Sequence, residues 1–219
     1  ESLPFIEAIR QFKFDVGTQN TLYVHLTYIP YIAAAGELKT KPTQHSVKSL
    51  QELGIQPDIL IPRTEQSIPK SAKEKIALFC NVEKKCVIEA KDQATIYQVP
   101  LEFNSNKLDD IICEKLGIDA PAADLDDWKK YVKYVKNPVH KVKIAIVGKY
   151  IGLKDSYKSI VEAFIHSGSE NRAKVELVWV NSEEVEHNGP GDILSDVSGI
   201  LVPGGFGDRG IEGKLLAVK

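Results

Sequence analysis

The sequence predicts an α/β fold with mostly parallel sheets, divided into two domains. Short apolar runs of buried-strand type, such as residues 58–61, alternate with segments whose apolar residues recur at helical spacing. Strands that alternate with helices need crossover connections, and these give parallel pairing. A charge-rich stretch interrupts the alternation at residues 119–141, and a new strand follows it. We therefore expect a first domain at 1–118, a linker at 119–141 and a second domain from 142 to 219.

The expected elements follow from apolar spacing and from the residues that stop each segment. Val47, Leu50 and Leu53 lie at helical spacing with Gly54 behind them, and the helix that begins at Leu108 is followed by Gly117 in the same way. Helices are expected at 3–11, 43–53, 71–79, 108–116, 125–135 and 156–166. Strands are expected at 23–29, 58–61, 87–89, 143–147, 175–180 and 199–202.

Composition bounds the possible functions. The net charge is −2 and 43% of the residues are hydrophobic, so the sequence shows no bias toward nucleic acid and enough apolar content for a packed core. No apolar run approaches the ~20 residues of a membrane span, and no signal peptide is visible. The three cysteines lack metal-ligand spacing, which favours reduced thiols in a cytoplasmic protein. Cys80 and Cys113 lie in apolar helical patterns and are expected in the core. Because the chain contains no Met, we expect an internal piece of a longer protein.

The run Lys39-Thr40-Lys41-Pro42-Thr43-Gln44 has the pattern of an anion site. Pro42 fixes its own φ and disfavours a helical conformation at Lys41, so we expect both lysines in an extended turn before the helix. The free N–H groups and the dipole of a helix N-terminus favour a bound anion, and the expected ligand is a polyphosphate. The alternative is a solvated basic turn before a surface helix.

A second candidate is the turn Pro203-Gly204-Gly205-Phe206-Gly207, which follows the apolar run that begins at Gly199. Glycines after a strand allow positive φ and a close approach to a ligand, and exposed N–H groups there can stabilise an oxyanion. The alternative is an ordinary glycine turn.

Several blocks of the sequence resemble CTP synthases. The segment from Gly36 to Val47 is similar to their UTP/CTP-binding signature. Further blocks hold the same order and spacing along the chain: Glu1–Gln11, Lys75–Val82, Ile96-Tyr97, Val147-Gly148-Lys149-Tyr150 and Val202–Gly207. The resemblance implies the C-terminal half of a P-loop-type synthase domain, then a linker and the start of a Rossmann-like class I glutamine amidotransferase domain.

The resemblance also implies an activity. In this family ATP, with Mg²⁺, phosphorylates O4 of UTP, and ammonia from glutamine displaces the phosphate to give CTP. GTP activates the enzyme allosterically and CTP inhibits it, within pyrimidine biosynthesis. The family assembles into tetramers and can form filaments, so UTP, CTP, glutamine and further copies of the chain are the expected partners, with no nucleic acid and no membrane.

The resemblance also implies which residues of this sequence bind each ligand. UTP and CTP are expected at Glu1, Lys39, Thr40, Lys41, Pro42, Thr43, Gln44 and Lys75, although Glu1 and Lys75 by themselves suggest solvated side chains. ATP is expected at Lys91, Asp92 and Gln93, where the family usually has a small apolar residue in place of Gln93. The glutamine oxyanion is expected at Gly205 and Gly204. The GTP effector is expected at Lys149, Arg209 and Glu212.

Some family motifs do not occur in these 219 residues. The sequence contains neither a Gly-x-x-x-x-Gly-Lys-Ser/Thr phosphate loop nor a Gly-x-Cys-x-Gly nucleophile elbow. By the resemblance the first lies before residue 1 and the second after residue 219, and the metal ligands also lie outside. We therefore expect the isolated chain to be inactive. The alternatives are a related ATP-dependent amidoligase and a non-catalytic scaffold that forms filaments or senses nucleotides.

Overall fold

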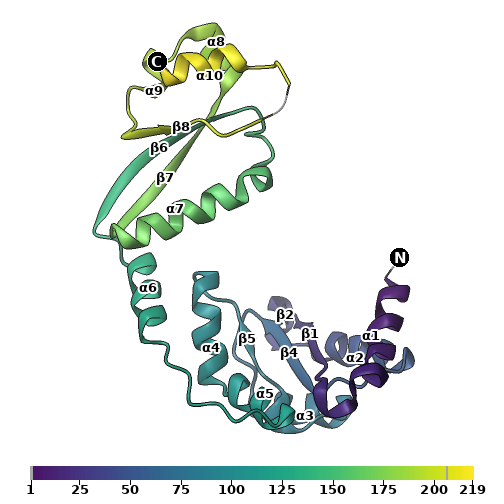
Figure 1. The fold of residues 1–219 in the computed structure, drawn as a ribbon. Helices are drawn as coiled ribbons and strands as arrows, with labels where there is room; N and C mark the ends of the chain where they lie inside the picture. The colour runs from purple at the N-terminus through teal and green to yellow at the C-terminus, as the bar shows by residue number, and fades with distance from the viewer. Residues whose placement is uncertain (1, 206) are drawn as a thin grey trace. The chain divides into compact units, whose positions relative to one another are not determined.

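The computed structural model describes residues 2–205 and 207–219, apart from the side chain of Lys154. The chain divides between Leu125 and Asp126 into two compact units. The helices and strands of the first unit are α1 (Leu3–Val16), β1 (Val24–Ile29), β2 (Tyr31–Ile32), β3 (Glu37–Leu38), α2 (Lys41–Glu52), β4 (Ile59–Thr64), α3 (Lys70–Cys80), β5 (Ala90–Lys91), α4 (Val99–Ser105) and α5 (Leu108–Leu116) (Figure 1).

The first unit is built on a parallel sheet in the order β1-β4-β5. Val24 pairs with Ile59 and Ile29 pairs with Thr64, so β1 and β4 run side by side over their whole length. Successive side chains of the central strand point to opposite faces. Leu60 packs on one face with residues of α2 and α3, such as Val47 and Ile76. Ile59 and Ile61 pack on the other face with residues of α5.

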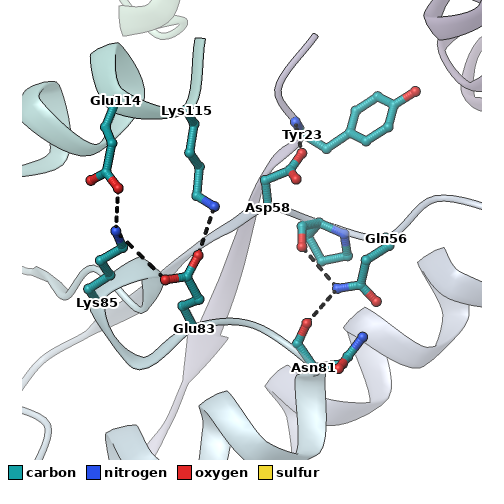
Figure 2. Close-up of polar contacts among 9 residues, drawn as sticks. Tyr23, Gln56, Asp58, Asn81, Glu83, Lys85, Glu114 and Lys115 are labelled. Atoms are coloured by element: carbon teal, nitrogen blue, oxygen red, sulfur yellow. Dashed lines mark hydrogen bonds and ion pairs between the residues drawn. The ribbon is translucent and has the colours of Figure 1, made fainter. Parts of the chain in front are cut away.

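Polar ties fix the loops at the amino ends of these strands (Figure 2). Asp58 accepts a hydrogen bond from the Tyr23 backbone N–H at 2.8 Å, which joins the starts of β1 and β4. The Gln56 amide donates to the Pro57 carbonyl at 2.9 Å and to the Asn81 carbonyl at 3.1 Å.

Two lysines complete these ties (Figure 2). Lys85 bonds Glu114 at 2.7 Å and lies 3.7 Å from Glu83, and Lys115 bonds Glu83 at 3.2 Å. Since Glu114 and Lys115 belong to α5, these pairs anchor that helix to the segment before β5.

The helices and strands of the second unit are α6 (Asp126–Lys136), β6 (His140–Gly148), α7 (Lys158–Glu170), β7 (Ala173–Asn181), α8 (Ser182–Asn188), α9 (Gly191–Leu194), β8 (Gly199–Leu201) and α10 (Ile211–Val218). This unit has its own parallel sheet, in the order β7-β6-β8. A core cluster around Ala145, Val147 and Val180 packs against Val185 of α8 and Ala217 of α10. Helix α7 packs against β7, and α6 packs against α7.

The expected α/β class with parallel sheets is therefore confirmed. The helix expected at 125–135 is α6, which packs against α7. Two local expectations need correction. The strand expected at 87–89 is only a single bridge between Val87 and Leu60, followed by the two-residue strand β5, because a 3₁₀ turn at Lys84–Cys86 delays the pairing. Cys113, expected in the core, is half-buried, whereas Cys80 is buried; both are free thiols.

Among the residues that the structure describes, no helix combines the length and the apolar character needed to cross a membrane.

Candidate functional site

A short hairpin positions the first lysine of the basic run. Strands β2 and β3 pair antiparallel, Ile32 against Glu37, and the Lys39 N–H donates to the Pro30 carbonyl at 3.0 Å. These bonds fix the backbone just before α2. Since parallel strands carry their ligand sites at their carboxyl ends, the hairpin after β1 lies at the edge where a ligand is expected.

Helix α2 begins at Lys41, so the expectation of an extended Lys41 was wrong. Pro42 is tolerated in the first turn because its missing N–H would have no intrahelical partner there. The Gln44 N–H donates to the Thr40 carbonyl at 3.2 Å and makes the first bond of the helix. The N–H groups of Lys41 and Thr43 precede that bond, and they are the backbone donors that this terminus offers to an anion.

The side chains of Thr43 and Gln44 serve the fold first. Thr43 is fully buried, and its Oγ1 lies 3.0 Å from the Tyr28 carbonyl and 3.0 Å from Thr27 Oγ1. It therefore anchors α2 on β1, which leaves its backbone N–H as the group that can serve a ligand. The Gln44 amide donates to Thr40 Oγ1 at 3.1 Å and is half-buried, so a ligand would have to compete for it.

One carboxylate lies among the lysines of this site. Lys39 forms an ion pair with Glu37, two residues before it on the same side of the extended chain. The hydrogen bond and the charge of Lys39 lower the pKa of Glu37, and the charge of Lys75 on α3 lowers it further. The structure thus brings Lys75, which is 36 positions further along the sequence, within electrostatic reach of the hairpin.

The residues at which ATP is expected lie beside a cavity of the first unit. Thr64 of β4 pairs with Lys91 of β5, and Asp92 follows directly. Asp92 bonds Arg63 through both oxygens, at 2.7 and 3.3 Å, and Arg63 lowers its pKa. These side chains border a cavity of about 490 Å³ whose apolar walls include Leu26, Ile61, Ile96 and Phe103.

Sequence reasoning missed Arg63 at this site. The available signal was an arginine near the carboxyl end of an apolar strand, where ligands of parallel sheets gather. The Gln93 amide donates back to the Lys91 carbonyl at 3.0 Å, and Lys91 Nζ lies 3.5 Å from Ser67 Oγ. The side chain of Gln93 therefore forms a hydrogen bond within its own turn. Gln93 nevertheless lines the cavity.

In the second unit, two lysines hold the glycine turn that follows β8. Lys149, at the end of β6, is buried, and its Nζ donates to the Gly207 carbonyl at 2.5 Å. Lys214 of α10 donates to the Pro203 carbonyl at 2.8 Å. Sequence reasoning missed Lys214, because nothing in the pattern of α10 shows which side chain faces a loop 11 positions earlier.

The expected backbone conformation of the turn was partly wrong. Gly207 has φ +74, but Gly204 and Gly205 do not lie in the left-handed region. A Cβ at 205 would lie 3.3 Å from Lys214 Nζ, the movable end of a flexible side chain, so space does not by itself require glycine there. Phe206 and Glu1 lie outside the described residues.

The three effector candidates are placed differently. The Lys149 ammonium is turned inward to Gly207, whereas Arg209 pairs with Glu183 at 3.4 Å and stays largely exposed. Glu212 is exposed in the first turn of α10. One hydrogen bond of the Lys149 ammonium goes to the Gly207 carbonyl, two positions before Arg209.

The comparisons with known proteins give a separate family match for each of the two units. Residues 1–118 match the family described as CTP synthase N-terminus, and residues 152–219 match glutamine amidotransferase class-I. The chain is 55% identical to the CTP synthase of Listeria innocua over 219 residues and 55% identical to that of Methanocaldococcus jannaschii over 225 residues. Each match covers 100% of the chain but only 41% and 42% of those relatives.

The fold and the matches define the class: an α/β synthase unit joined to the start of a class I amidotransferase unit. The chain belongs to the CTP synthase family. The resemblance found in the sequence is thereby confirmed, and the chain spans about two fifths of the length of the relatives it matches.

Proposed function

We propose that this chain carries part of a ligase that converts UTP to CTP with ATP and with ammonia released from glutamine. The observation that carries this proposal is the arrangement around the start of α2, where Lys39, Lys41 and the first N–H groups of the helix gather at the carboxyl edge of the sheet. A triphosphate matches this arrangement, because its charge is compensated by ammonium groups and by the helix terminus. Membership of the CTP synthase family is the reason to propose that the bound triphosphate belongs to a pyrimidine nucleotide.

Glu37 shapes how this site accepts its ligand. Its carboxylate forms an ion pair with Lys39. A bound phosphate would replace this carboxylate as the acidic partner of Lys39. Because Lys75 also acts on Glu37, the same exchange would draw Lys75 to the phosphate. Both UTP and the inhibitor CTP would use this site, since it contacts the part that the two nucleotides share.

The cavity beside Arg63 and Asp92 is the proposed place for the adenine of ATP. Apolar walls suit a flat base, and polar groups at the rim fix its orientation. In the proposed reaction, O4 of UTP takes the γ-phosphoryl group of ATP and ADP leaves. Ammonia then bonds to C4, and the C–O bond breaks to release phosphate.

The second unit would contribute part of the glutamine site. Attack of a nucleophile on the carboxamide carbon moves the C=O electron pair onto oxygen, and the N–H of Gly205, with that of Gly204, would stabilise this charge. Lys149, Arg209 and Glu212 are the proposed residues for activation by GTP. We further propose that the full-length protein assembles into tetramers or filaments in the cytoplasm.

Mg²⁺ would screen the phosphates of ATP when bound. Within residues 2–205 and 207–219, no group of three His, Cys, Asp or Glu side chains gathers as a metal site would require. The described residues do not fit a metal centre, and no step is assigned to a metal held by them.

The Lys39→Ala variant tests the pyrimidine site in the full-length protein. Loss of one charge-assisted hydrogen bond to phosphate should weaken UTP binding by about 1.5–3 kcal/mol, or roughly 10- to 150-fold. Binding of UTP, and its displacement by CTP, can be measured by titration. Lys48→Ala is the matched control, because Lys48 is an exposed lysine on the same helix. Unchanged UTP affinity in Lys39→Ala would refute the assignment.

The purified 219-residue chain should show neither CTP formation nor glutamate release from glutamine. The reason is chemical: its sequence holds no phosphate loop and no cysteine in a nucleophile elbow. The assay follows glutamate release and CTP formation with a full-length family member as positive control. Turnover that persists through repeated purification would contradict this expectation.

A further inference from the structure

We propose that Lys214 is a positioning residue for glutamine hydrolysis, which holds the glycine turn and places a fixed positive charge beside Gly205. This inference rests on the proposed oxyanion role of Gly205 and adds to it a residue outside the turn. Lys214 lies on α10, so the helix that follows the turn would also support it.

The first support is the bond from Lys214 Nζ to the Pro203 carbonyl, 2.8 Å long. In a planar trans peptide the C=O and the N–H point in opposite directions. Holding the Pro203 carbonyl toward Lys214 therefore aims the Gly204 N–H away from it, toward the other side of the turn. A donor that is fixed before the reaction needs no reorganisation when the oxyanion forms.

The second support is the closeness of the ammonium to Gly205. A Cβ built on Gly205 would lie 3.3 Å from Lys214 Nζ and 3.9 Å from Lys149 Cδ. The Lys214 ammonium thus lies in close contact with the position of such a Cβ, and Lys149 lies at van der Waals distance from it. This places a full positive charge next to the backbone whose N–H would face the developing negative charge.

The third support is that the turn is held at both ends by the same chemistry. Lys149 donates to the Gly207 carbonyl at 2.5 Å, as Lys214 does to Pro203. Burial lowers the pKa of Lys214, and the charge of Lys149 lowers it further, as expected for an ammonium held in a confined, positively charged place. Such a place attracts negative charge, and the tetrahedral oxyanion would supply it.

The expected signature follows from when that charge exists. The oxygen of bound glutamine is neutral and becomes negative only in the transition state, so an interaction with its charge should act on kcat and leave KM unchanged. A residue that merely stabilised the second unit would instead lower the denaturation midpoint of that unit together with glutamine-driven activity, and the fluorescence of Trp128 and Trp179 reports this midpoint.

The test uses Lys214→Met in the full-length protein, because Met keeps most of the length of the side chain without charge or donor. We expect kcat with glutamine to fall about 10- to 100-fold, with KM for glutamine and ammonia-driven synthesis nearly unchanged. Lys214→Arg should recover most of the loss, because it restores both charge and donor. Lys174→Met, at an exposed lysine of β7, is the control for simple loss of a charge.

Retention of glutamine-driven kcat within twofold in Lys214→Met would overturn the inference, as would equal loss with both nitrogen sources. If Lys214→Met fails to fold, Lys214→Gln is judged by the same criteria. A Gly205→Pro variant, measured in parallel, separates the two proposals. Insensitivity of glutamine-driven synthesis to Gly205→Pro would refute the oxyanion role itself, whereas a large effect there with none in Lys214→Met would refute only the role of Lys214.

Discussion

Replacing Gly205 by Pro should lower glutamine-driven CTP formation by the full-length protein about 10²–10³-fold, the usual cost of one lost oxyanion donor. Proline removes the backbone N–H at this position and fixes φ. Synthesis from added ammonium chloride should survive, because ammonia bypasses the amidotransferase unit. The measurement is CTP formation with each nitrogen source in turn.

Gly205→Ala is the matched control for this experiment. Alanine keeps the N–H, and the nearest atom to its Cβ would be the flexible end of Lys214, at 3.3 Å. The loss in Gly205→Ala should therefore be much smaller than in Gly205→Pro. Equal loss with glutamine and with ammonia in Gly205→Pro would show that the turn is structural, and full activity with glutamine would show that Gly205 is not the donor.

Gly213→Ala should destabilise the second unit by roughly 3 kcal/mol or more. Gly213 lies where α10 crosses the start of α8, and a Cβ there would overlap the Ser182 carbonyl and lie 3.0 Å from the Glu186 nitrogen. Both obstacles are backbone atoms, so the helices must separate to admit a methyl group. The separation would also disturb the core contact of Ala217 with Val185.

Tryptophan fluorescence reads this effect without interference from the first unit. The chain has two tryptophans, Trp128 and Trp179, and both belong to the second unit. The denaturation midpoint followed at these residues should drop in Gly213→Ala. It should stay close to the original in Gly191→Ala, because a Cβ at Gly191 meets no described atom within 4 Å. A Gly213→Ala midpoint equal to the control would contradict the close helix contact.

Sequence patterns predicted those elements whose signals are local. The helix at 108–116 was placed correctly, because its apolar stripe and the terminating Gly117 are both recognisable from neighbouring residues of the sequence. The four-residue helix α9 and the hairpin β2–β3 were missed, since each is too short to show a period. Helix α10 was missed because its run of apolar residues lacks the polar face that marks an amphipathic helix.

The candidate sites divide in the same way. Sequence reasoning proposed Lys39 and Gly205 because each lies in a run whose residue types suggest chemistry, and it proposed Lys91 through the family resemblance. It could not show that Thr43 turns inward to Tyr28, that Glu37 pairs with Lys39, or that Lys214 reaches Pro203. These contacts depend on which faces meet after folding, and no periodicity within a single element encodes them.

The hydrogen bonds of Gln56 and Asp58 and the ion pairs of Glu83 with Lys85 and Lys115 lie at the amino ends of the strands (Figure 2). The proposed nucleotide residues follow the carboxyl ends of the strands, at the opposite edge of the sheet. This separation divides the tasks of the first unit between two sets of loops. A population of variants could therefore explore new side chains around Lys39 or Asp92 while the amino-terminal edge keeps the strands aligned. Selection for nucleotide preference and selection for folding would act on different positions, and the unit could change its specificity without first losing its structure.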